Sequence, residues 1–462
     1  MNNKAFKSGM WYTISNFLMK AVGFITTPIF TRLMSQSEYG DFNYFQTWMM
    51  ILLYITSLNL EGSLIRASQE YKEDIDNYSF SMIILSTCST LVWWAICNIF
   101  FNSISNFLLI NRTYINCMFV YLLLCPAVNM FQNTERYKYK YKWTVAISMT
   151  ISIGASLLSV VFVLLFQDKL FGRTLGYVLP TFLVGCFIII YYVMHHCKLK
   201  VSYWKYALPI TLPYIPHLLS MYLLSNMDSV MILRFCGSEC VALYSLAYIC
   251  GMIITILVTS VNSAFSPWLA EKLNSGDYKA IKRISFPYVA IFSFFSIGAV
   301  LVTPEILFVL GGKSYMEAKY VMPPVTAGCL LQFVYCMYVN IEQYEKKTVG
   351  MAVASVLAAI INFVLNYIFI PIYGYIAAAY TTYVGYFFLL IMHMYLVKRL
   401  GKIHIYDNTK MFILALGTSI LIFLANNILD LFLVRYAIIA IYIIILFTII
   451  IKNRDKIKFL KQ

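Results

Sequence analysis

The chain has 462 residues, of which 61% are hydrophobic and 12% charged, and its mean hydropathy is +0.74. These values exclude an ordinary soluble domain and indicate a polytopic helical membrane protein. The net charge of +15 invites a nucleic-acid partner, but its distribution excludes that interpretation: the charges lie in the connections between apolar segments, as membrane topology requires.

About fourteen continuous apolar segments are long enough to cross a bilayer as helices, which takes about 20 residues each. The chain is therefore predicted to be an all-α polytopic membrane protein. The expected spans are residues 10–33, 42–65, 79–101, 114–134, 143–166, 174–194, 207–233, 242–268, 286–310, 322–343, 348–370, 375–397, 411–428 and 434–451.

The basic residues give the expected orientation. With the N-terminus inside, cytoplasmic segments hold 26 of the 35 Lys and Arg residues and external segments hold 8. Because basic residues gather on the cytoplasmic side, both termini are expected in the cytoplasm. The external loops have at most about a dozen residues, so none forms a catalytic domain and we expect no enzyme.

A weak internal repeat predicts the domain organisation. A shift of 202 residues aligns the first span with the seventh and places Arg32 on Arg234. Six helices per repeat make the two copies parallel, related by an axis along the membrane normal. We expect a six-helix lobe at residues 1–200, a second at 201–400, and an appended two-helix hairpin with a basic tail at 401–462.

The first span carries polar residues at spacings of three and four, which place them on one face of the helix. They are Thr13, Asn16, Lys20, Gly23 and Thr27. Lipid cannot solvate an ammonium group, so Lys20 is expected to face a bundle interior or a wet cavity, where it would attract a phosphate or carboxylate. An ion pair with Asp228 and snorkelling into water are the alternatives.

Polar residues also follow one face of later spans. They include Thr211, Tyr214 and Asp228 in the seventh span, Tyr248 and Asn262 in the eighth, and Ser355, Asn362 and Asn366 in the eleventh. These stripes predict a hydrated cavity between the two bundles, lined by substrate-binding residues. The alternative is that each residue hydrogen-bonds to a neighbouring helix.

Asp228 and Glu61 are interpreted as the only acids well inside the membrane. Either could take a proton or a sodium ion and couple a gradient to transport, and Asp228 could equally anchor its helix. Apart from such an ion, we expect no cofactor and no metal, because the eleven cysteines form no CxxC or Cys/His cluster.

Proline and arginine residues mark two further features of the spans. Pro209, Pro213 and Pro216 each remove a backbone hydrogen bond, so this part of the seventh span is expected to bend or break and to act as a hinge or gate. Arg32 and Arg234 lie at matching outer positions. They either anchor helix ends at headgroup phosphates or receive an anionic headgroup that leaves the cavity.

Two stretches resemble a known family. Leu224–Tyr248, LSNMDSVMILRFCGSECVALYSLAY, is similar to the segment that joins the seventh and eighth helices in bacterial polysaccharide transporters. Gly9–Phe45, GMWYTISNFLMKAVGFITTPIFTRLMSQSEYGDFNYF, is similar to their first-helix signature. These Wzx-type oligosaccharide flippases share a superfamily with multidrug and toxin extrusion carriers and the lipid II flippase.

The resemblance implies two six-helix lobes in a V that open alternately to either side. It implies a cargo of undecaprenyl-diphosphate-linked oligosaccharide, whose headgroup crosses through the cavity while its lipid tail stays in the bilayer. Asp228 matches an acidic position of the family, and Lys20 lies where relatives carry cavity charge. A bacterial inner membrane follows as the location, with a polysaccharide polymerase and chain-length machinery as candidate partners.

Three other functions compete with this one. A membrane enzyme acting on the same lipid would need a sizeable external loop, which is absent from the sequence. A cation-coupled multidrug antiporter would favour an acidic cavity, and Lys20 argues against it. A lipid II or teichoic-type lipid flippase would carry more basic residues in its cavity than this single lysine.

Overall fold

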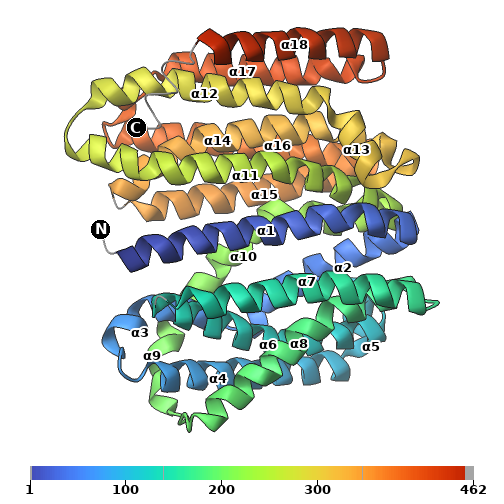
Figure 1. The fold of residues 1–462 in the computed structure, drawn as a ribbon, viewed down its shortest axis with the longest axis vertical. Coiled ribbons are helices and arrows are strands. Elements are labelled where there is room, and N and C mark those ends of the chain that lie inside the picture. Colours follow the sequence, from blue (N-terminus) through green and yellow to red (C-terminus); the bar gives the residue numbers. More distant parts are fainter. Residues whose placement is uncertain (1–2, 139, 346, 453–462) are drawn as a thin grey trace. The chain divides into compact units, whose positions relative to one another are not determined.

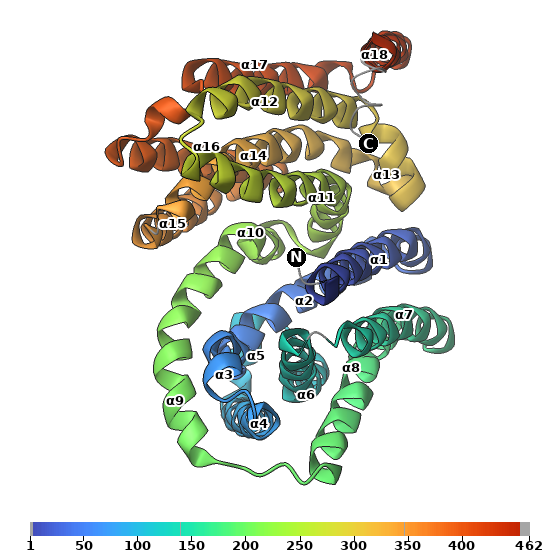
Figure 2. The ribbon, with the colours of Figure 1, turned by 60° about the vertical axis from the view of Figure 1, so that its left-hand side comes forward.

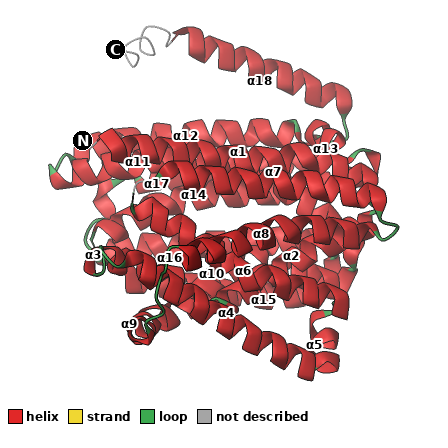
Figure 3. Ribbon diagram, turned by 60° about the horizontal axis from the view of Figure 1, so that its bottom comes forward, coloured by secondary structure: helices red, strands yellow, loops and turns green. Residues whose placement is uncertain are grey.

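The computed structural model describes residues 3–138, 140–345 and 347–452 (Figure 1). Within these ranges every regular element is a helix (Figure 3). Ten helices are long and apolar enough to cross a membrane, and a bent pair adds an eleventh span. The prediction of an all-α polytopic membrane protein is confirmed.

Contacts within the chain group it into unit 1, Met1–Ala242, and unit 2, Leu243–Gln462. Unit 1 holds α1 (Asn3–Leu33), α2 (Gln36–Thr56), η1 (Leu60–Ser63), α3 (Leu64–Glu70), α4 (Ile75–Ile99), α5 (Phe101–Leu108), α6 (Arg112–Tyr137), α7 (Tyr141–Leu165), α8 (Lys169–Met194), α9 (Val201–Thr211), η2 (Leu212–Tyr214) and α10 (Ile215–Cys236).

The helix α11 (Ser238–Asn274) starts in unit 1 and continues into unit 2. Unit 2 then holds α12 (Tyr278–Leu301), α13 (Thr303–Gly311), η3 (Lys313–Tyr320), α14 (Met322–Tyr344), α15 (Thr348–Tyr373), α16 (Ile376–Arg399), η4 (Ile403–Ile405), α17 (Asn408–Ala425), η5 (Asn426–Ile428) and α18 (Phe432–Lys452).

Helices occupy all fourteen expected spans. Several of these spans, among them 10–33, 207–233, 242–268 and 434–451, contain side chains that lie outside the described residues. The two units are defined by contacts within the chain, whereas the predicted boundaries at residues 200 and 400 were defined by the internal repeat. The repeat-based lobes and their V therefore stay predictions.

Each unit is built around one helix that is buried on most faces. In unit 1 this helix is α6, in which 67% of the residues of its most apolar stretch are buried. In unit 2 it is α14, in which 83% are buried. The helices that pack against α6 include α4, α7 and α8, and those that pack against α14 include α12, α16 and α17. In Figure 2, α9 runs outside α3 and α4 on its way from α8 to α10.

The two predicted C-terminal hairpin helices differ in how they attach to unit 2. α17 packs along α12 and α14. α18 is fixed by Arg435, which is 4% exposed and donates from Nη1 to the Glu305 carboxylate at 2.6 Å. Tyr442 of α18 also donates to the carbonyl of Phe294 and stacks on its ring, with centroids 4.0 Å apart.

The helices α7 and α8 meet through small residues. A Cβ atom on Gly176 would lie 2.4 Å from the backbone nitrogen of Ser159, and one on Gly172 would lie 2.6 Å from the carbonyl oxygen of Phe162. Ser159 Oγ donates to the Arg173 carbonyl at 3.1 Å across the same contact. Two glycines four residues apart thus let the two backbones touch, as in other membrane helix pairs.

This contact gives a stability prediction. Gly176→Ala forces α7 and α8 apart, because a backbone atom cannot rotate away from the new methyl group; such overpacking costs about 1–3 kcal/mol. We expect the unfolding temperature in detergent to fall by at least about 3 °C. The matched control is Gly417→Ala in α17, where nothing lies within 4 Å of the added Cβ and helix propensity improves. An unchanged unfolding temperature for Gly176→Ala would contradict the close packing.

Candidate functional site

The expected span 42–65 is interrupted in the structure. α2 ends at Thr56, and the segment from Leu60 to Glu70 continues at an angle of 51°. Leu58 and Asn59 between them have left-handed φ values of 52° and 47°. A left-handed backbone is uncommon for non-glycine residues. Because strained conformations cluster at functional sites, we treat this break as a candidate site.

A cavity of about 30 Å³ lies beside this break, within unit 1. Its lining residues come from the break itself and from α4 and α6. The polar ones are Tyr54, Ser57, Asn59, Glu61, Ser86 and Asn129. A water molecule needs about 10–15 Å³ of such space, so the cavity is large enough for about two waters or one small cation.

Glu61 supplies the charge of this cavity. Asn133 Nδ2 of α6 donates to its Oε2 at 3.2 Å, which fixes the carboxylate against α6. The C-terminal carbonyls of α2 also point toward the break, and a helix C-terminus carries partial negative charge. A carboxylate, amide and hydroxyl oxygens and a helix C-terminus together favour a proton or a hard monovalent cation.

The structure places the polar face of the first span along α1. The side chains of Thr13 and Asn16 lie outside the described residues. Lys20 is exposed, with no hydrogen bond or ion pair to a described side chain, whereas Thr27 is 5% exposed and donates to the Gly23 carbonyl. The polar face of α1 is therefore buried at Thr27 and exposed at Lys20.

Arg32 and Arg234, the two arginines predicted at matching outer positions, each contact a backbone carbonyl within unit 1. Arg32 Nη1 donates to the Pro28 carbonyl at 2.8 Å. Arg234 Nη2 lies 3.5 Å from the Phe107 carbonyl, with its guanidinium 5.9 Å from the Phe107 ring centroid. Both side chains are exposed, and their role toward a headgroup stays a prediction.

The seventh span is broken where its prolines stand. α9 contains Pro209, η2 contains Pro213, and α10 begins just before Pro216. Tyr214 in the 3₁₀ turn is 49% exposed. Farther along α10, Asp228 is 1% exposed. Whether this break works as a hinge stays a prediction.

Polar residues of the later spans pair with neighbouring helices in unit 2. Asn262 Oδ1 of α11 accepts from Asn340 Nδ2 of α14 at 2.8 Å. Tyr248, by contrast, packs on Tyr244 of its own helix, with centroids 5.1 Å apart. Asn362 is 1% exposed and donates to Thr382 of α16 at 3.1 Å. For α15, the alternative of helix-joining hydrogen bonds is therefore correct.

Besides Asp228 and Glu61, two further acids are buried within the protein near helix ends. Glu342 in α14 has a side chain 1% exposed and contacts His393 of α16 at 2.8 Å. Glu135 near the end of α6 is also buried, at 4% exposed. Both acids stand beside expected span ends, so hydropathy alone gave no signal; a histidine inside the span 375–397 was the available clue.

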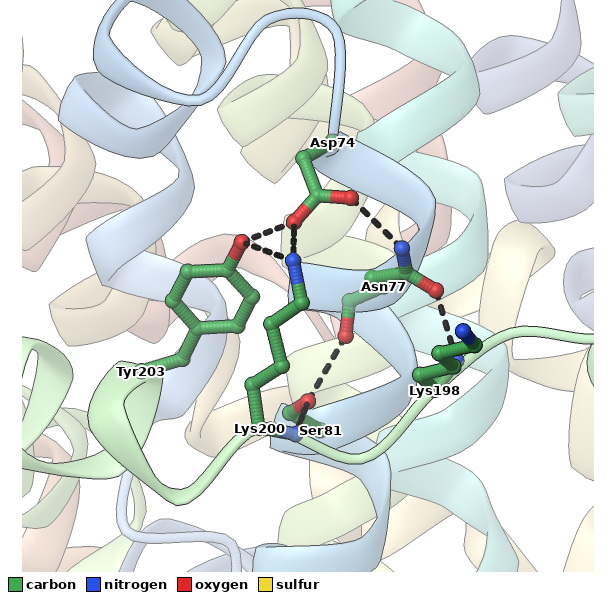
Figure 4. A network of polar contacts seen from close by, with 6 residues as sticks. All are labelled: Asp74, Asn77, Ser81, Lys198, Lys200 and Tyr203. Carbon is green, nitrogen blue, oxygen red and sulfur yellow. Dashed lines mark hydrogen bonds and ion pairs between the residues drawn. The ribbon is translucent and has the colours of Figure 1, made fainter.

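A second polar cluster lies at the start of α4 (Figure 4). The Asp74 carboxylate accepts from Lys200 Nζ at 2.5 Å, from the Tyr203 hydroxyl and from Asn77 Nδ2 at 2.5 Å. The backbone of the linker before α9 is held too, because Lys198 N donates to Asn77 and Lys200 N donates to Ser81.

This cluster attaches the linker between α8 and α9 to α4. Burial acts to raise the pKa of Asp74, but hydrogen bonds from Lys200, Tyr203 and Asn77 outweigh it and hold that pKa below its usual range. A lowered folded-state pKa means that the attachment is complete above the unfolded-state pKa and is lost as pH falls through the folded-state value.

Comparison with known proteins decides the family. The family described as "Polysaccharide biosynthesis protein" matches residues 5–272, more than half of the chain. The chain belongs to this family. The family described as "MatE" also matches residues 213–368.

The chain is similar to the following proteins at low sequence identity. The "Lsg locus putative protein 1" of Haemophilus influenzae is 22% identical over 377 residues, which cover 78% of this chain and 89% of the relative. The solved structure "Lipid II flippase MurJ, inward closed conformation" has a TM-score of 0.71 at 15% identity and covers 97% of this chain and 100% of its own.

An inward-facing multidrug resistance MATE transporter of the MOP superfamily has a TM-score of 0.57 at 16% identity, covering 85% of this chain and 95% of its own. At these identities the two solved structures show the fold alone. The chain is thus a multi-pass membrane protein with the fold of flippases and multidrug transporters, in a family of polysaccharide biosynthesis.

The linker cluster can be tested by proteolysis. Asp74→Ala removes the acceptor that holds Lys200 and Tyr203, so trypsin should cleave after Lys198 or Lys200 about 3- to 10-fold faster. Asp277→Ala is the matched control, because Asp277 caps α12 and pairs with Lys272 at 3.3 Å in unit 2. Equal cleavage rates in wild type and Asp74→Ala would refute the attachment.

Proposed function

We propose that this protein is a flippase for undecaprenyl-diphosphate-linked oligosaccharide repeat units. It moves them from the inner to the outer face of the bacterial cytoplasmic membrane by alternating access, for O-antigen, capsule or exopolysaccharide assembly. The observation that carries the proposal is the family match over residues 5–272, which includes both Gly9–Phe45 and Leu224–Tyr248.

The predicted substrate-binding residues would supply the chemistry that such a headgroup needs. Lys20 would bind the diphosphate as a mobile point charge, which holds an anion without a rigid bidentate geometry. Tyr214, half exposed, offers an aromatic face and a hydroxyl to a sugar ring, and Asn16, Tyr248 and Asn262 would add hydrogen bonds. Arg32 and Arg234 would receive the headgroup at the outer side.

Coupling to an ion gradient is part of the proposal. Glu61 lines a cavity that is large enough for a small cation, and Asp228 is a buried acid on a broken helix. A proton or sodium ion bound at either acid would favour one conformation over another, and Pro209, Pro213 and Pro216 would give the hinge.

Location and partners follow from the same proposal. Both termini would lie in the cytoplasm, and a polysaccharide polymerase with its chain-length machinery would use the product outside. No nucleic acid is involved.

A cation-coupled multidrug antiporter is the second candidate. The observations that favour it are the MatE match over residues 213–368 and the fold shared with a multidrug transporter. Against it stands the exposed Lys20, since a cationic drug would be repelled by a lysine. A lipid II or teichoic-type flippase is a third candidate, supported by the shared fold with MurJ.

Complementation tests both the function and Lys20. In a strain without its own flippase, supplied with a homologous repeat unit, the wild-type chain should restore polymer export. Lys20→Ala should lower export about 10- to 100-fold, because a hydrogen bond to a charged group contributes about 1.5–3 kcal/mol, and Lys20→Arg should retain most of it.

Lipid-linked repeat units are counted on each membrane face, with protein levels matched. Lys279→Ala is the control, an exposed lysine at the start of α12. Full export with Lys20→Ala would refute the role of this lysine. Failure of the wild type with every repeat unit tried, together with gradient-driven cation efflux from vesicles, would support the antiporter instead.

A further inference from the structure

A carboxylate and an imidazole lie in contact inside unit 2, between α14 and α16. Nδ1 of His393 is 2.8 Å from Oε1 of Glu342, and the two side chains are 3% and 1% exposed. Both helices are long and apolar enough to cross a membrane. An ionisable pair in such a place is costly to keep, so a function is the first explanation to consider.

The second observation concerns the other oxygen of the same carboxylate. Glu342 Oε2 is buried and has no hydrogen-bond partner among the described residues. An ionised carboxylate has about four sites for hydrogen bonds, and a buried acceptor without a partner costs about 1–3 kcal/mol. The pair is therefore poorly stabilised as a permanent charge but can be neutralised by one additional proton.

Two protonation states account for the geometry. In the first, the neutral imidazole donates from Nδ1 to the carboxylate, and the pair has a net charge of −1. In the second, one more proton lies on Nε2 or on Oε2, and the net charge is zero. The low dielectric of a bundle interior favours the state of zero net charge.

Few other ionisable groups face the pair. On α14 the Tyr335 ring stacks on His393 with centroids 5.5 Å apart, and Tyr338 donates to Asn408 of α17. α15 carries no acidic or basic residue within Thr348–Tyr373. From α11, Asn262 meets Asn340 as a neutral amide pair.

Charged residues near the ends of these helices form contacts with other residues. Glu345, three residues beyond Glu342, pairs with Lys402 at 3.3 Å. On η4, His404 packs against the ring of Tyr278, which begins α12. On α17, Lys410 pairs with Asp407 at 2.9 Å. None of these contacts supplies a counter-charge to the pair, so its own proton sets its charge.

The geometry excludes a metal ion between the two groups. The imidazole nitrogen touches the carboxylate directly at 2.8 Å, which leaves no room for a coordinated ion. Among the residues that the structure describes, no group of three or more His, Cys, Asp or Glu could hold a metal.

We propose that Glu342 and His393 form a proton-binding site, at which unit 2 takes up and releases one proton. The pair is sealed between α14 and α16, and His393 lies six residues, about 9 Å by helix rise, before the end of α16 at Arg399. Exchange with water therefore requires α14 and α16 to separate at this end, which couples the proton to a conformational change. That this change drives transport rests on the proposed function.

The first test measures the proton directly and needs no substrate. The imidazole ¹⁵N signals of the full-length protein in nanodiscs are followed from pH 4 to pH 10, and His393 is assigned by its loss in His393→Asn. We expect a reversible change of the His393 signal with pH that differs between the wild type and Glu342→Gln, because the carboxylate touches the imidazole. A His393 signal that does not change with pH, or that titrates identically in Glu342→Gln, would overturn the site.

The second test asks whether the proton is used. In vesicles from the complemented strain, the wild type should move lipid-linked repeat units several-fold faster when a pH gradient is imposed. Glu342→Gln and His393→Asn should both lose this stimulation. If only one of the two variants folds, its transport rate alone decides the test. Glu345→Gln is the matched control, because its carboxylate pairs with Lys402 outside the bundle interior.

The two tests fail separately. If His393 titrates with Glu342 but transport in the wild type ignores the pH gradient, the coupling is refuted and the proposed cargo is untouched. If the wild type moves no lipid-linked repeat unit, the proposed function is refuted, while the titration still decides the proton site.

Discussion

Hydrocarbon offers no partner to a polar group, and the rest of this structure depends on that constraint. Every backbone and side-chain polar atom in a span must find its partner inside the protein. The helices satisfy their backbones, and hydroxyls such as Thr31, Thr90 and Ser419 donate to carbonyls of their own helix. Glu61, which lines a small polar cavity, and Glu342, which has one carboxylate oxygen buried without a hydrogen-bond partner among the described residues, differ from these self-satisfied hydroxyls.

The same constraint explains why the spans were predictable from the sequence. About 20 apolar residues in a row have few alternatives to a membrane helix, so all fourteen expected segments are helical. The break after Thr56 was not predictable, because Leu58 and Asn59 adopt left-handed backbone without a glycine or proline to indicate it. That conformation is imposed by packing with α4 and α6, which a local pattern does not contain.

The site was predictable only in part, because sequence periodicity shows which residues share one face of a helix but not which groups that face contacts. The stripe of Asn362 and Asn366 reads like a cavity lining, yet its amides bond to Thr382 and Thr381 of α16. Lys20 also reads like a cavity residue; its side chain is exposed, and its place in a cavity stays a prediction. Glu342 was overlooked because it stands one residue before the end of the predicted span 322–343, and its burial against His393 of α16 is a tertiary contact that hydropathy does not show.

Charge is rare in the apolar helices, and three of the charged residues stand in different surroundings. Lys20 is exposed, Glu61 lines a small polar cavity, and Glu342 is buried in contact with His393. A flippase for an anionic lipid headgroup needs these three elements: an accessible cation, a polar path and a titratable group that responds to a gradient. A passive membrane anchor needs none of them.

The most direct measurement is transbilayer movement in liposomes that contain only the purified protein and a lipid-linked oligosaccharide. A headgroup-specific reagent added outside reports the fraction exposed on the outer leaflet over time. We expect the protein to raise this fraction beyond the half that is accessible at the start, with no such effect in protein-free liposomes. An accessible fraction that stays at one half, while the same liposomes exchange a cationic drug for protons, would contradict this expectation.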